Sequence, residues 1–422
     1  MNNKYLFILS DCTLMQNLLE RIASRYGKFS KSTKILIIFE FLAAIQNGII
    51  SFLLIFYIRY IGYSPVIYGL ITSISGLVFL LFVLPSGIIS SKIGAKSMIK
   101  YGILISILYL IILLFFKDVP FLIFSGALSG LSWAFVQPGF GSLLASSSTP
   151  EERNYVFSLN GFSNLLGMSI GTVIGGYFPS IGRYFFNNDL YGYKLSFVFS
   201  ILIFLTLFLF FKNIDIDIKM ERGKRIELPR DVKITLIKLT LPAMLIGFGA
   251  GFVIPYFQLQ FKYRFGISIE SISYIFAITD VLMAILMLYI PFVSERVGTL
   301  KTIVALWLLA TISLFMMPFI SYLPFGFYIF SSLYVIRTIL MNVAGPIQSS
   351  FEFSLIPKEY RMITSSLLSL AWVGMNSLSA YFGGLLIVYS LNIPFYICTS
   401  FYLSSAIMYW IFFKNYIPRF KE

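Results

Sequence analysis

The 422-residue chain contains no histidine, only two cysteines, and a charged fraction of just 12%. The lack of histidine excludes an imidazole proton relay and any histidine-ligated metal site. Cys12 and Cys398 lie in unlike surroundings and suggest neither a disulfide nor a metal site. No nucleophile–base pair, phosphate-binding loop or ATP-binding motif stands out. We therefore expect no enzyme activity, no metal and no cofactor, and any transport must run on a gradient.

Apolar residues are abundant, at 58% of the chain, and aromatic residues make up 18%. Soluble domains are about a quarter charged, and one of this length has too little interior to bury so many apolar side chains. The composition predicts a helical membrane protein with several spans. The net charge of +14 is typical of nucleic-acid binders too. Here the basic residues lie in short loops between apolar segments, so we interpret them as topology signals and expect no nucleic-acid partner.

Twelve apolar segments are each long enough to cross a hydrocarbon core of about 30 Å. The expected spans are 35–58, 66–90, 98–116, 121–145, 154–178, 192–211, 239–261, 271–292, 300–317, 324–348, 362–388 and 392–413. They predict an all-α membrane protein whose transmembrane helices form two six-helix bundles, 35–211 and 239–413. A cytoplasmic linker, 212–238, joins the bundles. Residues 1–34 form an N-terminal segment with an amphipathic helix on the membrane surface, and 414–422 form a tail.

Charge predicts which way the spans run. With the N-terminus, the linker and the C-terminus on one side, that side carries 25 Lys/Arg and the other side carries six. Because cytoplasmic loops are enriched in Lys and Arg, we place both termini and the linker in the cytoplasm. The expected location is the cell membrane.

The two halves resemble each other in spacing. Gly62 is 32 residues before Gly94, and Gly266 is 32 residues before Gly298. The pairs Pro138 with Arg153 and Pro346 with Arg361 are each 15 residues apart. The offset between halves is 204 in the early spans and 208 in the later ones. A repeat of two bundles with the same orientation is typical of transporters that work by rocking.

One loop motif occurs in both halves and carries a family resemblance. The major facilitator superfamily has the loop Gly-x-x-x-Asp-Arg-x-Gly-Arg-Arg between its second and third spans. The first half has Gly87, Ser91, Lys92 and Gly94 at these places, and the second half has Glu295, Arg296 and Gly298. The chain is identified as a member of this superfamily from about residue 35 to 413, although Ser91 replaces the acid. The resemblance implies a cytoplasmic gate in which Glu295 reaches the start of the fifth span near Arg153, and Ser91 the start of the eleventh near Arg361.

The fifth span contains a glycine motif, formed by Gly167, Gly171, Thr172, Gly175 and Gly176. It resembles a motif of the family's antiporters, with Thr172 where that motif has proline. Glycines four residues apart also let two helices approach closely. The resemblance thus favours an antiporter, and the spacing favours close helix packing.

Three ionisable residues, Glu40, Asp280 and Arg337, lie inside the expected spans. Each costs about 2.5–3.5 kcal/mol at a helix centre on insertion scales, so a functional role is the default hypothesis. The resemblance places Asp280 and Arg337 on spans that face the central cavity, where the pair would couple transport to protons. The alternative is a permanent salt bridge between two helices. Glu40 is a second candidate for proton coupling, and the alternative for it is hydration or pairing with Lys34.

Neutral polar and aromatic side chains inside the spans predict a substrate cavity. They are Asn47, Gln137, Asn160, Asn164, Gln258, Gln348, Trp372 and Asn376. Such a cavity suits a small amphiphilic or weakly basic molecule. The leading hypothesis is a monomeric, proton-coupled prokaryotic exporter of small lipophilic compounds, with membrane lipids around it. The alternatives are an uptake symporter or facilitator for a metabolite such as a sugar or organic acid, and a sensor or lipid-handling scaffold with no transport activity.

Overall fold

The computed structural model describes residues 29–149, 152–211, 228–287, 289–320 and 323–415. The expected amphipathic helix at 11–27 lies outside these residues, as do 212–227 of the expected linker and 416–422 of the tail. Within the described chain the regular elements are all helices, and twelve of them are long and apolar enough to span a membrane. The predicted all-α fold is confirmed.

The first bundle has six helices, one for each expected span. They are α2 (Lys31–Tyr60), α3 (Pro65–Ile93), α4 (Ala95–Phe115), α5 (Val119–Ser146), α6 (Arg153–Phe186) and α7 (Asp189–Phe210). Their observed ends extend the expected spans by up to eight residues, because helices continue beyond the apolar stretch that marks the membrane core. The second bundle contains α8 (Arg230–Val253), α9 (Phe257–Phe265), α10 (Ile269–Met287), α11 (Ile290–Val297), α12 (Thr299–Ile320), α13 (Gly326–Ser354), α14 (Arg361–Tyr389) and α15 (Ile393–Phe413).

Two spans of the second bundle are each divided. The seventh begins at Arg230, inside the stretch expected to be linker, and changes to a short 3-10 turn at Ile254–Tyr256 before α9. Pro255 in this turn has no N–H to donate, so a regular helix cannot pass through it unbroken. The eighth span ends at Met287, and α11 follows as a separate short helix with Pro291 in its first turn.

Four turn glycines adopt positive φ and repeat between the halves. The φ angles are +96° at Gly62 and +64° at Gly266, and +88° at Gly94 and +96° at Gly298. A residue with a Cβ rarely takes such angles. The repeat seen in the spacing therefore corresponds to equivalent turns at equivalent places in the two bundles.

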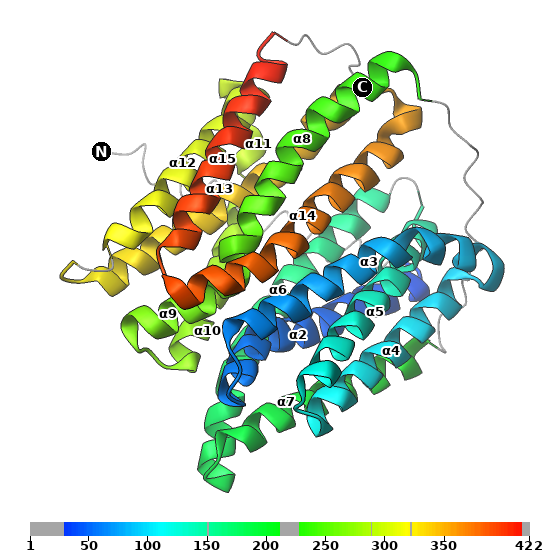
Figure 1. Ribbon diagram of the computed structural model, residues 1–422. Helices are drawn as coiled ribbons and strands as arrows, with labels where there is room; N and C mark the ends of the chain where they lie inside the picture. Colours follow the sequence, from blue (N-terminus) through cyan, green and yellow to red (C-terminus); the bar gives the residue numbers. More distant parts are fainter. Residues whose placement is uncertain (1–28, 150–151, 212–227, 288, 321–322, 416–422) are drawn as a thin grey trace, which may run out of the picture.

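The two bundles meet near one end of the molecule and diverge toward the other (Figure 1). We call the end with the turns at Gly94 and Gly298 the linker end, and the end with those at Gly62 and Gly266 the far end. Between α3 and α14, Ser73 Oγ donates to Ser377 O and accepts a 3.0 Å hydrogen bond from Tyr381 N. A further set of contacts joins α6 to α10.

The α6–α10 contacts lie in the far-end half of both helices. Ser169 Oγ donates to Ala277 O at 3.1 Å, and Ser180 Oγ donates to the Glu270 carboxylate. The hydroxyls of Tyr177 and Tyr274 also form a hydrogen bond. The bundles are thus fastened at the far end.

Glycines bring α2 and α6 together inside the first bundle. A Cβ on Gly171 would lie 2.1 Å from the Ile45 carbonyl oxygen, and one on Gly48 would lie 2.4 Å from the Met168 carbonyl oxygen. Gly167 and Gly175 also face α2, whereas Gly176 faces Ser273 of α10. The glycine motif of the fifth span therefore packs α6 against both bundles.

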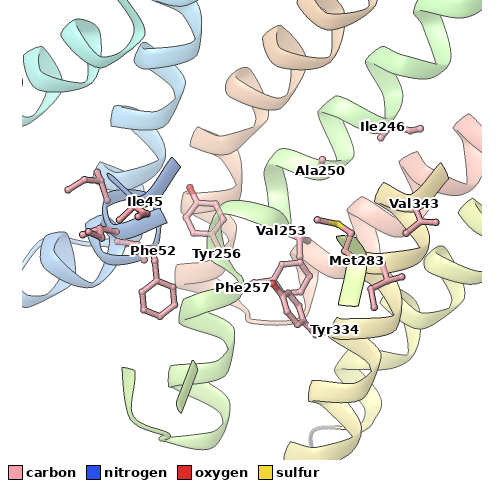
Figure 2. Close-up of a cluster of buried hydrophobic side chains, with 14 of the residues drawn as sticks. Ile45, Phe52, Ile246, Ala250, Val253, Tyr256, Phe257, Met283, Tyr334 and Val343 are labelled. Atoms are coloured by element: carbon pink, nitrogen blue, oxygen red, sulfur yellow. The ribbon is translucent and has the colours of Figure 1, made fainter. Parts of the chain in front are cut away.

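The second bundle has an aromatic core. In Figure 2 the rings of Phe257 and Tyr334 lie next to each other, and their centroids are 4.8 Å apart. Phe261 adds a further ring, 5.4 Å from Tyr334 and 5.1 Å from Phe330. Edge-to-face contacts of this kind favour tight, dry packing.

Candidate functional site

A cavity of about 580 Å³ lies within the first bundle, with walls from α2 to α7. Its volume is that of a pocket for a small organic molecule. Amide and hydroxyl groups line it together with aromatic and aliphatic side chains. The polar lining residues are Glu40, Gln46, Asn47, Ser51, Tyr68, Thr72, Ser75, Ser106, Tyr109, Ser125, Ser129, Ser132, Gln137, Asn160 and Asn164.

Glu40 is the one charged side chain among the described residues that line this cavity. Asn164 Nδ2, on α6, donates a 2.6 Å hydrogen bond to Glu40 Oε1, on α2. Asn160 lies one turn before Asn164, and its buried Oδ1 has no hydrogen-bond partner. A carboxylate with an open acceptor amide beside it can bind a proton or a donor group of a solute.

Hydrogen bonds fix the deeper walls of the cavity. Gln46 Nε2 donates to Tyr109 OH at 3.2 Å, which ties α2 to α4. Ser132 Oγ on α5 donates to Gly102 O at 2.9 Å and bonds to Ser106 Oγ. Because each of these groups has a partner, the polar wall is held in one arrangement.

The structure brings together half of the residues expected to form a substrate cavity. Asn47, Gln137, Asn160 and Asn164 line the first-bundle cavity with Glu40. Gln258, Gln348, Trp372 and Asn376 belong to the second bundle and do not line it. Their place inside apolar spans identified these residues, but it gives no information on which bundle encloses a space.

The four second-bundle residues have different surroundings. Gln258 is buried in the first turn of α9 with no partner for Oε1, and Asn376 has none for Nδ2. The Trp372 side chain is 40% exposed, while its backbone packs closely against Gly247 of α8. Gln348 Nε2 donates to Glu352 Oε1 at 2.8 Å.

Asp280 and Arg337 do not form an ion pair, although both lie in the described chain. Arg337 is 2% exposed, and its Nη2 donates to Tyr402 OH at 2.5 Å. Its guanidinium carbon lies 5.5 Å from the centre of the Phe257 ring and 5.4 Å from that of Tyr402. Arg337 Nε is buried without a partner. Aromatic faces and a hydroxyl therefore hold this cation, and half-buried Asp280 on α10 lies apart from it.

Glu352 is a buried carboxyl group that the sequence analysis missed. It is 6% exposed and lies near the end of α13. The expected tenth span ended at 348, so Glu352 was assigned to a loop. The signal that would have found it is the spacing from Gln348, four residues earlier, which places the two side chains on one helical face.

The gate residues Glu295, Arg153 and Arg361 lie at the linker end. Glu295 is exposed and forms no ion pair with Arg153, and both lie in the described chain. Arg153 Nη2 instead donates to Ala145 O at 3.4 Å, and Arg361 Nε donates to Phe353 O at 3.1 Å.

The other residues of the two gate loops are mostly exposed. Lys92 and Arg296 are exposed in the last turns of α3 and α11, next to the turn glycines Gly94 and Gly298. A Cβ on Gly87 would meet nothing within 4 Å. These described residues of the two gate loops thus face outward rather than into the bundle cores.

Comparison with known proteins identifies the family. The model of the Major Facilitator Superfamily matches residues 36–380. The chain belongs to this superfamily. A transporter of this superfamily is a multi-pass membrane protein that moves small molecules and is not an enzyme, so the predictions of fold, transport and no enzyme activity are confirmed.

Several relatives and structures are similar to this transporter. An uncharacterised MFS-type transporter of Methanocaldococcus jannaschii is 23% identical over 79% of this chain and 84% of its own. A bacterial homologue of the iron transporter ferroportin, in an inward-facing state, has a TM-score of 0.75 at 14% identity, over 92% of this chain and 99% of its own.

Two further structures have the same fold. A variant of the nucleoside transporter NupG has a TM-score of 0.73 at 13% identity, over 91% of this chain and 100% of its own. A bacterial homologue of the human lysosomal transporter Spinster, in an inward-facing and occupied conformation, has a TM-score of 0.72 at 16% identity. The match covers 91% of this chain and 96% of its own. At these identities the likeness shows the fold alone.

Proposed function

We propose that this protein is a proton-coupled antiporter that exports small amphiphilic, weakly basic organic molecules from the cytoplasm. The observation that carries the proposal is the cavity of about 580 Å³, with Glu40 as its one charged group among the described lining residues. A protonated amine and a proton would compete for the same carboxylate, and such competition produces antiport. Aromatic residues such as Trp133 and Phe140 in the same wall suit the apolar part of the solute.

Asn164 supports this role for Glu40. Its amide donates a 2.6 Å hydrogen bond to one carboxylate oxygen, which fixes the orientation of the carboxyl group in the cavity wall. Asp280 is the other candidate proton carrier, with Arg337 its partner in a conformation where the two side chains meet. The cavity favours Glu40, because a coupling carboxylate must be reached by both proton and solute.

The orientation is part of the proposal. The excess of Lys and Arg at the linker end supports a cytoplasmic location of both termini. In that orientation the linker end, where the bundles diverge, faces the cytoplasm. Contact of Glu295 with the α6 start near Arg153, and of Ser91 with the α14 start near Arg361, belongs to the outward-open state. We expect the transporter to act as a monomer surrounded by membrane lipid.

An uptake symporter or facilitator for a metabolite is the second candidate. The hydroxyls of Ser125, Ser129 and Ser132 favour it, since hydroxyl-lined cavities suit sugars. An anionic organic acid fits less well, because Glu40 would repel it. A non-transporting sensor is the third alternative.

Flux in proteoliposomes tests these alternatives. A thermal-shift screen with amines, sugars and organic acids identifies a stabilising compound, and its radiolabelled form is then followed under an imposed pH gradient. Antiport predicts that the compound and protons move in opposite directions. Movement in the same direction supports the symporter, and no flux under any gradient supports the sensor.

A further inference from the structure

A second concave site lies on the outside of the second bundle, far in sequence from the Glu40 cavity. It is a groove of about 370 Å³ between α12 and α15. The α12 wall contains Lys301, Val304, Ala305 and Leu308, which share one helical face because they are spaced by three and four residues. The α15 wall contains Ala406, Ile407 and Trp410.

The groove has an apolar body and a basic mouth. Lys301 lies in the first turn of α12, and Trp410 lies in the last turn of α15, so both mark the linker end. Lys414 N donates to Trp410 O at 2.8 Å, which places exposed Lys414 one turn beyond the tryptophan on the same helix. From Lys301 to Leu308 the groove follows the helix for about 10 Å at 1.5 Å per residue.

A rigid wall lies behind the groove. The Trp307 and Tyr409 rings are 5.1 Å apart, and both side chains are buried. Ala305 and Ala406 contribute almost no side-chain bulk, so they create the space between the two helices. The groove is therefore built into the packing of α12 against α15.

The first bundle has a different surface at the equivalent place. With the offset of 204, Tyr101 corresponds to Ala305 and Ser97 to Lys301. Tyr101 is 52% exposed on α4. The first bundle thus has a bulky ring in place of the small residue and a neutral residue in place of the cation.

We propose that the α12–α15 groove binds one anionic phospholipid from the membrane leaflet at the linker end. One acyl chain occupies the groove from Val304 to Leu308, and the phosphate lies between Lys301 and Lys414. Trp410 lies at the boundary between chain and headgroup, the depth that tryptophan prefers in membranes. Lysines bind phosphate as point charges. This inference does not depend on the proposed transport function.

Native mass spectrometry of the purified full-length transporter tests this inference. The protein is offered an equimolar mixture of phosphatidylglycerol and phosphatidylcholine, and the lipids that it retains are counted. A lysine near a membrane surface contributes about fivefold to binding of an anionic lipid. We expect one retained phosphatidylglycerol and a preference of about 25-fold over phosphatidylcholine.

Three variants make the test specific. Lys301→Gln with Lys414→Gln should reduce the preference to about one, whereas Lys100→Gln, next to Tyr101 in the first bundle, should leave it unchanged. Ala305→Tyr copies the first-bundle residue and keeps both lysines, and it should abolish the retained lipid. Three results would overturn the proposal: an equal loss of preference in Lys100→Gln, an unchanged preference in the double lysine variant, or a retained lipid in Ala305→Tyr. Each variant's melting temperature without added lipid, equal to that of the wild type, verifies folding.

Discussion

The two bundles share a backbone plan but differ in what fills them. In the first, α2, α5 and α6 enclose a polar cavity around Glu40, and Asn164 bonds to that carboxylate. In the second, aromatic rings pack between α9 and α13, and Arg337 is buried against Phe257 of α9 and Tyr402 of α15. Repeated turns at Gly62 and Gly266 therefore coexist with unlike interiors.

The repeat offsets give this difference residue by residue. Glu40 corresponds to Met244, and Asn164 corresponds to Trp372. The second bundle therefore has large apolar side chains at positions where the first bundle has polar groups of the cavity. In the other direction, Arg337 corresponds to Ser129 of the cavity wall. The two halves thus share a backbone repeat, and the differing side chains leave the polar cavity in the first half.

The largest expected effect is on proton-driven flux, and it distinguishes Glu40 of the first bundle from Asp280 of the second. Glu40→Gln removes the group that we propose to carry the proton, so proton-driven flux in proteoliposomes should be lost. Asp280→Asn, in the second bundle, should retain most of it. Equal insertion of the two variants into the membrane is the control. The comparison breaks if Asp280→Asn abolishes proton-driven flux and Glu40→Gln transports like the wild type.

The second effect tests the close packing of α2 against α6. Gly171→Ala would place its Cβ 2.1 Å from the Ile45 carbonyl oxygen. Overpacking of this kind costs typically about 1–3 kcal/mol, so the melting temperature in detergent should fall by several degrees. Gly161→Ala on the same helix, where a Cβ meets nothing within 4 Å, should leave it equal or slightly higher. Similar losses in both would mean that the loss at Gly171 does not come from its contact with α2.

The third effect concerns the buried cation of the second bundle. Tyr402→Phe removes the hydroxyl that accepts the 2.5 Å bond from Arg337, and leaving such a group unsatisfied costs about 1–3 kcal/mol. Arg337→Met removes the charge itself and should be nearly neutral for stability. Thermal unfolding of both variants measures the difference. A larger loss in Arg337→Met would show that the cation stabilises the bundle.

The smallest effect is at the loops of the linker end. A charge near an exposed helix start contributes about 0.3–1 kcal/mol, which shifts a two-state balance by a factor of about two to five. Glu295→Gln should therefore favour the state open at the linker end, and Ser91→Asp should favour the opposite state. Spin-label distances between α5 and α13 at that end report the populations. Identical distance distributions in wild type and Glu295→Gln would leave the loop as a turn only.

Sequence alone predicted the scaffold well because its signals are local. Apolar length gave twelve spans, and the spacing of Gly62, Gly94, Gly266 and Gly298 gave the repeated turns. It missed the division at Pro255, since the apolar stretch continues through the break. The position of Arg337 within an apolar segment correctly predicted that it lies inside a span. It did not predict the direction of the side chain, because that direction depends on the rings of Phe257 and Tyr402, which are distant in sequence.

The site was predictable only in part, because sequence signals are local and a cavity is formed by several helices. Glu40, Ala44, Asn47 and Ser51 share one stripe of their helix, a pattern that indicates a face toward protein or water. All four line the cavity. Which bundle encloses the space depends on side-chain volumes from five other helices. No single-helix pattern contains that information, so Trp372 and Asn376 were included as well.

The location of the cavity within one bundle limits what binding can do. A ligand shifts a two-state equilibrium only by the difference between its affinities for the two states, whatever its absolute affinity. Contacts made entirely by the first bundle move with that bundle and are the same before and after rocking. A solute held there provides no driving force by itself. In the proposed mechanism, the work of reorientation therefore comes from second-bundle groups that meet the solute on closure, or from protonation and deprotonation of Glu40.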